Sequence, residues 1–168
     1  MKKKLVIFII VIIALKISAQ ESPITDSKKN EFGIHAGAVT GLGLSYRHWF
    51  DKAGIQITAL PVKTDYETFI SAGLTGLYAF HNSKYMMVFG YLGNHLFIGE
   101  ESKDVYNPYN RINETVYEDR LYYNIGFGPG FAFGKTVRFN LMVGHGFYDI
   151  FEKFNMYPTG EIGLYFRF

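Results

Sequence analysis

The chain has 168 residues, with 17 basic and 15 acidic side chains and no cysteine. This length predicts a single domain, and the lack of cysteine excludes a disulfide framework and thiol chemistry. Aromatic residues reach 18%, with 16 Phe and 13 Tyr, a share that is high for a soluble domain.

The first 19 residues have the layout of a secretory signal peptide. A basic start is followed by the apolar run Leu5–Leu15, and small residues end at Ala19. The run is shorter than the roughly 20 apolar residues that a membrane-spanning helix needs. We therefore expect export, with cleavage near Ala19 and Gln20.

Cleavage changes the charge of the chain. Without Lys2, Lys3, Lys4 and Lys16, 13 basic residues stand against 15 acidic ones, which gives a net charge of −2. This balance predicts no nucleic-acid partner.

Residues 20–30 are polar and predict a short flexible leader. The chain then alternates between strand-like runs and turn signals, without a convincing amphipathic helix. Eight strands are predicted, at Glu31–Val39, Leu42–Phe50, Ala53–Leu60, Thr68–Phe80, Lys84–Ile98, Arg120–Phe133, Thr136–Tyr148 and Thr159–Phe168.

Short and long connections alternate along these runs. The tight turns are Asp51-Lys52, His81–Ser83 and Gly134-Lys135, and the long polar connections are Pro61–Glu67, Gly99–Asp119 and Asp149–Pro158. The first connection, Thr40-Gly41, breaks the pattern because it is short on the side of the long loops. Such alternation along an even number of strands is typical of outer-membrane barrels.

The stretch Tyr123–Gly134 (YNIGFGPGFAFG) alternates small and large residues. Its period of two predicts a strand whose small face looks into a crowded interior and whose aromatic face looks at lipid or a packed core. Pro129 cannot donate a hydrogen bond to a neighbouring strand, so we expect a bulge or an unpaired position at residues 128–130.

Polar residues share one face of several runs, and apolar residues share the other. We expect a hydrogen-bonded, charge-paired plug inside the barrel, because an eight-stranded barrel is just wide enough for side chains to fill it. Its predicted members are Arg47, Gln56, Asn124, Arg138, Asn140 and Glu161. In Thr68–Phe80 the apolar residues could face outward, but Leu77 would then face inward, and Lys84–Ile98 is apolar on both faces, so the orientation of these two runs stays open.

The last residues, Gly160–Phe168, alternate apolar side chains and end on an aromatic one. This pattern resembles the terminal strand of Gram-negative outer-membrane barrels, and Phe166 and Phe168 would be the signal read by the barrel assembly machinery. Together with the signal peptide, eight strands and uneven loops, residues 31–168 resemble the small OmpA/OmpX-type barrels, without a peptidoglycan-binding domain.

The resemblance implies an all-β, eight-stranded antiparallel up-and-down transmembrane barrel. It would be a monomer in the outer membrane, in contact with lipid and lipopolysaccharide, without a cofactor or metal. We expect a non-enzymatic role in surface interaction, adhesion or envelope integrity. The acidic, tyrosine-rich segment Gly99–Asp119 is the candidate contact with an unknown surface partner, through Glu100, Glu101, Asp104, Tyr106, Tyr109 and Tyr117.

Two alternatives stay open. Some small outer-membrane barrels modify lipids with a histidine on the outer rim, and His145 has that position here, although no serine lies near it in sequence. A secreted lipocalin-like barrel would instead enclose an apolar ligand cavity.

Overall fold

The computed structural model describes residues 28–63, 68–107, 112–152 and 154–168. Within these ranges, the side chains of residues 63, 68, 100–107 and 112–119 are not described. The predicted signal peptide and most of the predicted leader lie outside these ranges. Within them, no helix is both long and apolar enough to cross a membrane.

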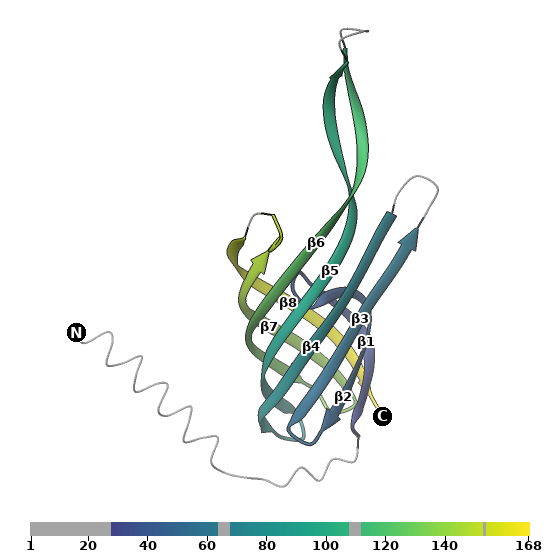
Figure 1. The fold of residues 1–168 in the computed structure, drawn as a ribbon. Coiled ribbons are helices and arrows are strands. Elements are labelled where there is room, and N and C mark those ends of the chain that lie inside the picture. The colour runs from purple at the N-terminus through teal and green to yellow at the C-terminus, as the bar shows by residue number, and fades with distance from the viewer. Residues whose placement is uncertain (1–27, 64–67, 108–111, 153) are drawn as a thin grey trace, which may run out of the picture.

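Eight antiparallel strands follow one another around a closed barrel (Figure 1). Each strand pairs with the next in sequence, and β1 pairs with β8 to close the sheet. The fold class is therefore confirmed as an all-β, eight-stranded antiparallel up-and-down barrel. The strands are β1 (Asn30–Gly37), β2 (Gly41–Phe50), β3 (Ala53–Lys63), β4 (Thr68–Asn82), β5 (Met86–Asn107), β6 (Ile112–Phe133), β7 (Val137–Tyr148) and β8 (Asn155–Arg167).

The two ends of the barrel differ. One end carries the tight turns after β2, β4 and β6 together with the C-terminus, and we call it the short-turn end (Figure 1). Strand pairing extends beyond several predicted boundaries at the opposite end. Pro61 was predicted in a loop but pairs with Ile70, and β8 begins at Asn155 rather than Thr159.

The segment Gly99–Asp119 was predicted as a loop, and this prediction is wrong. Its two arms continue β5 and β6 as a hairpin, paired from Gly99 with Arg120 to Asn107 with Ile112. Pairing of β4 with β5 stops at Ile98, so the hairpin projects beyond the barrel wall (Figure 1). The polar side chains of this segment lack the apolar alternation that predicts a strand. Its backbone N–H and C=O groups can nevertheless pair between the two arms, because this pairing does not depend on the side chains.

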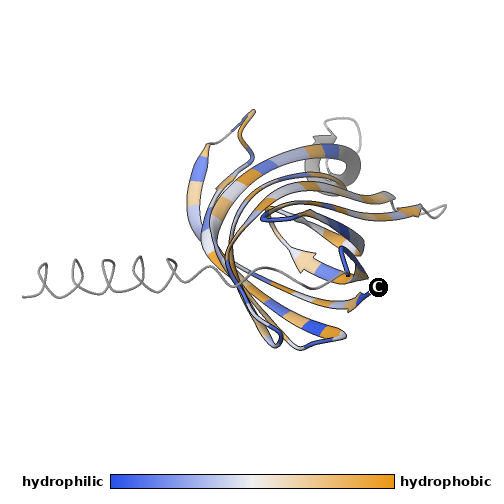
Figure 2. Ribbon diagram, turned by 90° about the horizontal axis from the view of Figure 1, so that it is seen from below, coloured by the Kyte–Doolittle hydropathy of each residue, from blue (hydrophilic) through white to orange (hydrophobic). Residues whose placement is uncertain are grey.

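The predicted polarity of the two faces is confirmed. Ile34, Leu44 and Leu92 point outward and are 60%, 58% and 62% exposed, whereas the largest fully buried side chains are Arg47 and Arg138. Hydrophobic and hydrophilic residues alternate along the strands (Figure 2). This distribution is the reverse of a soluble protein, in which arginine is almost never fully buried unless paired.

The structure also settles the orientation of β4 and β5. Leu77 and Ala79 of β4 and Met87, Phe89 and Tyr91 of β5 point inward. They form the apolar side of the interior with Trp49, Ala132 and Met142. Their orientation was ambiguous because apolar side chains lie on both their inner and their outer faces.

Pro129 lies in a break of the ladder, as expected, but not in a bulge. Pairing between β6 and β7 is interrupted between Phe127 with His145 and Gly130 with Met142, and the register is the same on both sides. Pro129 keeps its place opposite Gly90 of β5. The irregularity in register lies elsewhere, between Ala79 and His81 of β4.

Candidate functional site in the barrel interior

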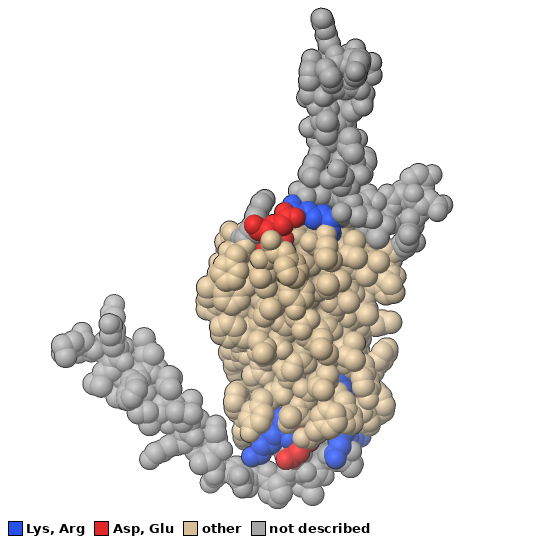
Figure 3. Space-filling view, in the orientation of Figure 1, with Lys and Arg blue, Asp and Glu red and all other residues tan. Residues whose placement is uncertain are grey.

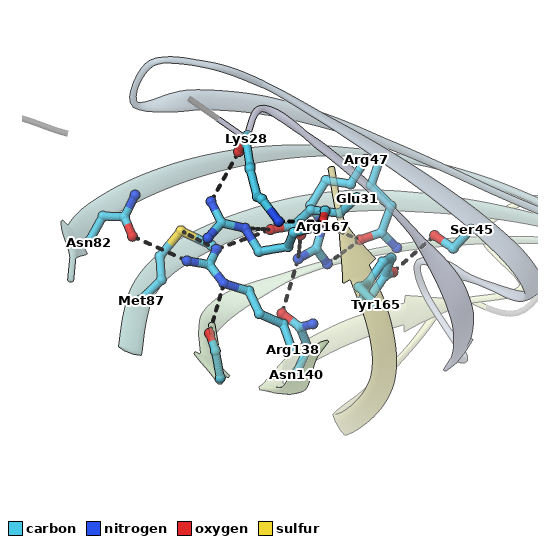
Figure 4. Close-up of polar contacts among 12 residues, drawn as sticks. Lys28, Glu31, Ser45, Arg47, Asn82, Met87, Arg138, Asn140, Tyr165 and Arg167 are labelled. Atoms are coloured by element: carbon cyan, nitrogen blue, oxygen red, sulfur yellow. Dashed lines mark hydrogen bonds and ion pairs between the residues drawn. The ribbon is translucent and has the colours of Figure 1, made fainter. Parts of the chain in front are cut away.

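The first polar group inside the barrel surrounds Glu31, near the short-turn end (Figure 4). Its carboxylate, on β1, accepts from Arg47 Nη1 at 3.2 Å and from Arg138 Nη1 at 3.0 Å, and it lies 3.3 Å from Arg167 Nε. Glu31 is directly opposite Arg47 on β2 and Arg167 on β8. We call these four residues the Glu31 cluster, and they join the strands that close the barrel.

Neutral groups complete the surroundings of Arg47. Its guanidinium donates to Gln56 Oε1 at 2.6 Å and to Asn140 Oδ1 at 3.0 Å. It also lies 4.3 Å from the ring centre of Tyr165, close enough for a cation–π contact. Tyr165 in turn donates to Ser45 Oγ at 2.9 Å. Arg47 is therefore held from several directions in a buried position, as a buried charge requires.

The second polar group surrounds Glu161 and holds the connection between β1 and β2. Residues Ala38–Thr40 form a turn that folds into the barrel, and Val39 is fully buried. We call these three residues the inward turn. The Glu161 carboxylate accepts from the Val39 amide at 3.3 Å and from the hydroxyl of Thr40. The Thr40 hydroxyl oxygen also lies 2.6 Å from His35 Nε2.

A further set of bonds holds the inward turn from β5 and β6. The Ala38 carbonyl accepts from His95 Nδ1 and from Asn124 Nδ2, both at 3.0 Å. Because a carbonyl only accepts, His95 Nδ1 carries the hydrogen, and Nε2 can accept from Ser71 Oγ at 2.8 Å. The amide of Leu42 donates to the same serine oxygen at 2.8 Å. A neutral His95 with its hydrogen on Nδ1 is therefore compatible with all of these hydrogen bonds.

The glycine row of β6 makes room for the inward turn. A Cβ atom at Gly126 would lie 2.3 Å from Val39 Cγ2, and one at Gly130 would lie 2.4 Å from the Phe89 ring. Such distances are far inside van der Waals contact. The small face of Tyr123–Gly134 therefore looks into a crowded interior, as predicted, and the crowding comes from Val39 and Phe89.

The predicted interior residues thus fall into two groups rather than one plug. Arg47, Gln56, Arg138 and Asn140 belong to the Glu31 cluster and its neighbours, whereas Glu161 and Asn124 hold the inward turn. Glu31 and His35 were missed as members. The alternation of Glu31, Gly33 and His35 with Phe32 and Ile34 is a signal that could have placed both inside.

The structure describes the remaining predicted site residues to different extents. His145 faces outward and is exposed, and its side chain has no hydrogen bond or ion pair with another residue of the described ranges. Tyr109 lies outside the described residues, as do the side chains of Glu100, Glu101, Asp104, Tyr106 and Tyr117. Within the described part, no group of three or more His, Asp or Glu residues could hold a metal ion.

Phe166 and Phe168 both face outward at the seam between β8 and β1. Each is 52% exposed, and their ring centres lie 6.5 Å apart with nearly parallel planes. The Phe168 amide donates to Asn30 O at 2.9 Å. The final aromatic residue is therefore fixed beside the strand that closes the barrel.

No family model matches the sequence, and no curated protein matches it. Solved structures with a similar fold include two β-barrels. The N-terminal β-barrel domain of Pseudomonas aeruginosa OprF has 12% identity and a TM-score of 0.47, over 83% of this chain and 96% of that one. Ail of Yersinia pestis, the attachment invasion locus protein, solved with the heparin analogue sucrose octasulfate, has 15% identity and a TM-score of 0.32, over 83% and 94%.

Proposed function

We propose that this chain is a non-enzymatic outer-membrane barrel that acts at the cell surface, in surface interaction, adhesion or envelope integrity. The observation that carries the proposal is the outer wall of the barrel. In the view of Figure 3, charged side chains gather at the two ends, and the wall between them carries none. Outer-membrane barrels have an outward apolar band of this kind, about 25 Å tall.

The aromatic residues at the two ends of the apolar band also support a membrane location. Phe50 and Phe133 are exposed near the short-turn end, and Phe151 and Phe154 are exposed at the other end. Aromatic residues gather in this way at both interfaces of transmembrane barrels. A soluble monomer rarely exposes a continuous apolar surface of more than a few hundred Å².

The interior supports a structural role for its charges. In the Glu31 cluster and around Glu161, charged groups are buried and engage one another or the backbone, so they stabilise a filled barrel. A lipocalin-like protein would need an apolar interior for its ligand, and here the largest fully buried side chains are arginines. Among the described residues, no side-chain hydrogen bond or ion pair of His145 supports the lipid-modifying alternative.

The first test is cell fractionation followed by a denaturing gel with and without boiling. We expect the protein in the outer membrane, with an unboiled band that migrates differently from the boiled one, because a closed barrel resists the detergent. A protein recovered from the periplasm or medium without such a shift would contradict the proposal.

A charged substitution on the outer wall tests directly whether the wall faces lipid. Leu141 faces outward in the middle of β7, between Phe131 and Ile162. We expect Leu141→Arg to lower the free energy of unfolding in liposomes by about 2–4 kcal/mol, the range for arginine at the bilayer midplane. Urea titration of the refolded protein measures it.

The matched control for Leu141→Arg is Tyr85→Arg on a short turn, where Tyr85 is 63% exposed. Near the interface the same charge costs only about 0–1 kcal/mol. If both variants change stability by less than about 0.5 kcal/mol, as surface substitutions in water do, the wall does not face lipid.

We further propose that the β5–β6 hairpin makes the surface contact. It extends beyond the barrel, and the segment Gly99–Asp119 carries six acidic residues against Lys103 and Arg111. Glu100, Glu101, Asp104, Tyr106, Tyr109 and Tyr117 are the proposed contact residues. Phe166 and Phe168 are proposed as the signal for the barrel assembly machinery.

Replacing residues 100–119 by a two-residue turn separates the possible roles. We expect the boiling shift to be kept, because the described residues of this segment, 100–107 and 112–119, pair with one another and not with the barrel wall. We expect attachment of producing cells to coated surfaces to fall to the level of cells without the gene. If attachment is unchanged while loss of the whole gene increases detergent sensitivity, envelope integrity is the role, and the hairpin does not make the contact.

A further inference from the structure

A groove of about 600 Å³ lies on the outer wall of the barrel, over β4, β5 and β6. Its sides are formed by Tyr78 and Phe80 of β4, by Leu92 of β5, and by Phe127 and Pro129 of β6. None of the described residues that line it is charged. Its volume lies within the range of roughly 300–1,000 Å³ that is usual for ligand sites in proteins.

Two glycines on the outward face create the groove. Gly76 of β4 is opposite Leu92, and Gly90 of β5 is opposite Tyr78, so the two glycines are diagonal neighbours in the wall. A Cβ atom at Gly90 would lie 3.1 Å from the Phe80 ring, which covers that position. A Cβ atom at Gly76 would lie 3.8 Å from the Leu92 carbonyl oxygen, so the space over Gly76 is open.

The shape of the groove favours a slender apolar occupant. The groove is continuous with the apolar wall, so the molecules that reach it in a membrane are lipids. Apolar surfaces gain little from the hydrophobic effect in lipid, but close packing adds dispersion contacts. An acyl chain over Gly76 contacts protein below it and on both sides, whereas a chain on a flat part of the wall contacts protein on one side. The groove therefore holds one chain more firmly than the rest of the wall does.

Lysines at the neighbouring turns indicate the charge of the headgroup. The β4–β5 turn carries Lys84 and the β6–β7 turn carries Lys135, and both side chains are exposed at the short-turn end. Gly90 lies four residues along β5 from Met86, the first residue of the strand, which is roughly 13 Å. A lipid that enters the groove from this end therefore places its headgroup at the level of the lysines, which attract negative charge.

We propose that this groove binds one acyl chain of an anionic phospholipid, whose headgroup lies beside Lys84 and Lys135. The proposal rests on the proposed membrane location, because only a wall inside a membrane meets phospholipid. It adds that one part of the wall retains a single lipid after the others have been exchanged for detergent.

Native mass spectrometry of the full chain counts the retained lipids. The protein is refolded in a non-ionic detergent and mixed with phosphatidylglycerol, and phosphatidylcholine with the same acyl chains is the reference without net charge. We expect one phosphatidylglycerol molecule per barrel and roughly tenfold weaker retention of phosphatidylcholine, because the lysines attract an anionic headgroup.

Gly76→Leu fills the groove and should weaken the retention of phosphatidylglycerol at least tenfold. The matched control is Gly160→Leu on β8, because an added Cβ atom also lies in open space there and Gly160 does not border the groove. If Gly76→Leu does not refold, Leu92→Ala removes one side of the groove and should also weaken retention. Its control is Leu164→Ala, which shortens an exposed leucine of β8.

The lysines are tested by Lys84→Gln, which should lower the preference for phosphatidylglycerol over phosphatidylcholine roughly fivefold. Lys29→Gln is the control, because it removes an exposed lysine next to β1, a strand that does not pair with β4, β5 or β6. Equal retention of the two lipids by the unchanged chain overturns the anionic headgroup.

Three results would overturn the groove as the site: no retained lipid, equal retention by Gly76→Leu and Gly160→Leu, or a lipid-free dimer that Gly76→Leu disrupts. The third result would assign the groove to a second copy of the chain. The measurement uses detergent and a barrel that shows the boiling shift, so its failure is distinguishable from failure of the outer-membrane location, which fractionation tests separately.

Discussion

Replacing Glu31 by glutamine is expected to lower the free energy of unfolding by about 3–5 kcal/mol. Removing one partner of a buried ion pair leaves the other charge without compensation, which is the costly change in such sites. Here three arginines lose their shared carboxylate, and two of them lie on the strands that flank β1 at the closing seam. The expected result is a barrel that closes less stably, with the same fold.

Urea unfolding of refolded Glu31→Gln, followed by Trp49 fluorescence, measures this loss. Glu152→Gln is the control, because Glu152 contacts Arg120 at the rim and its side chain is 55% exposed; exposed pairs contribute about 0–1 kcal/mol. In the double variant Glu31→Gln/Arg138→Gln we expect part of the stability to return, since one uncompensated charge is removed. Equal effects of Glu31→Gln and Glu152→Gln would falsify the central role of Glu31.

Replacing Glu161 by alanine is expected to release the inward turn and to lower the free energy of unfolding by about 3–5 kcal/mol. The variant removes the acceptor of the Val39 amide and of the Thr40 hydroxyl, and it also leaves Thr159 without its 3.4 Å contact. Each buried donor left without a partner costs about 1–3 kcal/mol. Glu161→Gln keeps an acceptor oxygen and should lose less.

The rate of thiol labelling measures whether the inward turn stays buried. The chain has no cysteine, so Val39→Cys introduces a single reactive group at a fully buried position. We expect a water-soluble thiol reagent to react slowly with Val39→Cys alone and at least tenfold faster when Glu161→Ala is added. Equal rates in the two proteins would mean that Glu161 does not hold the turn inside.

The number of strands and the faces of most of them were predictable from the sequence because alternation is a local property. Side chains alternate with a period of two, so Phe166 and Arg167 must point to opposite faces whatever they contact. The uneven connections then indicated an up-and-down barrel. The same alternation predicted Arg47, Gln56, Arg138 and Asn140 as interior residues.

Only the tertiary structure decided which interior residues meet. Glu31 contacts Arg138 across 107 positions of sequence, and such a pair depends on the register of every strand and on closure of β1 against β8. The inward turn depends on space that Gly126 leaves for Val39, which no local pattern reveals. The orientation of β4 and β5 was hidden because their inner face packs Leu77 and Phe89 into an apolar region, and alternation carries no information when both faces are apolar.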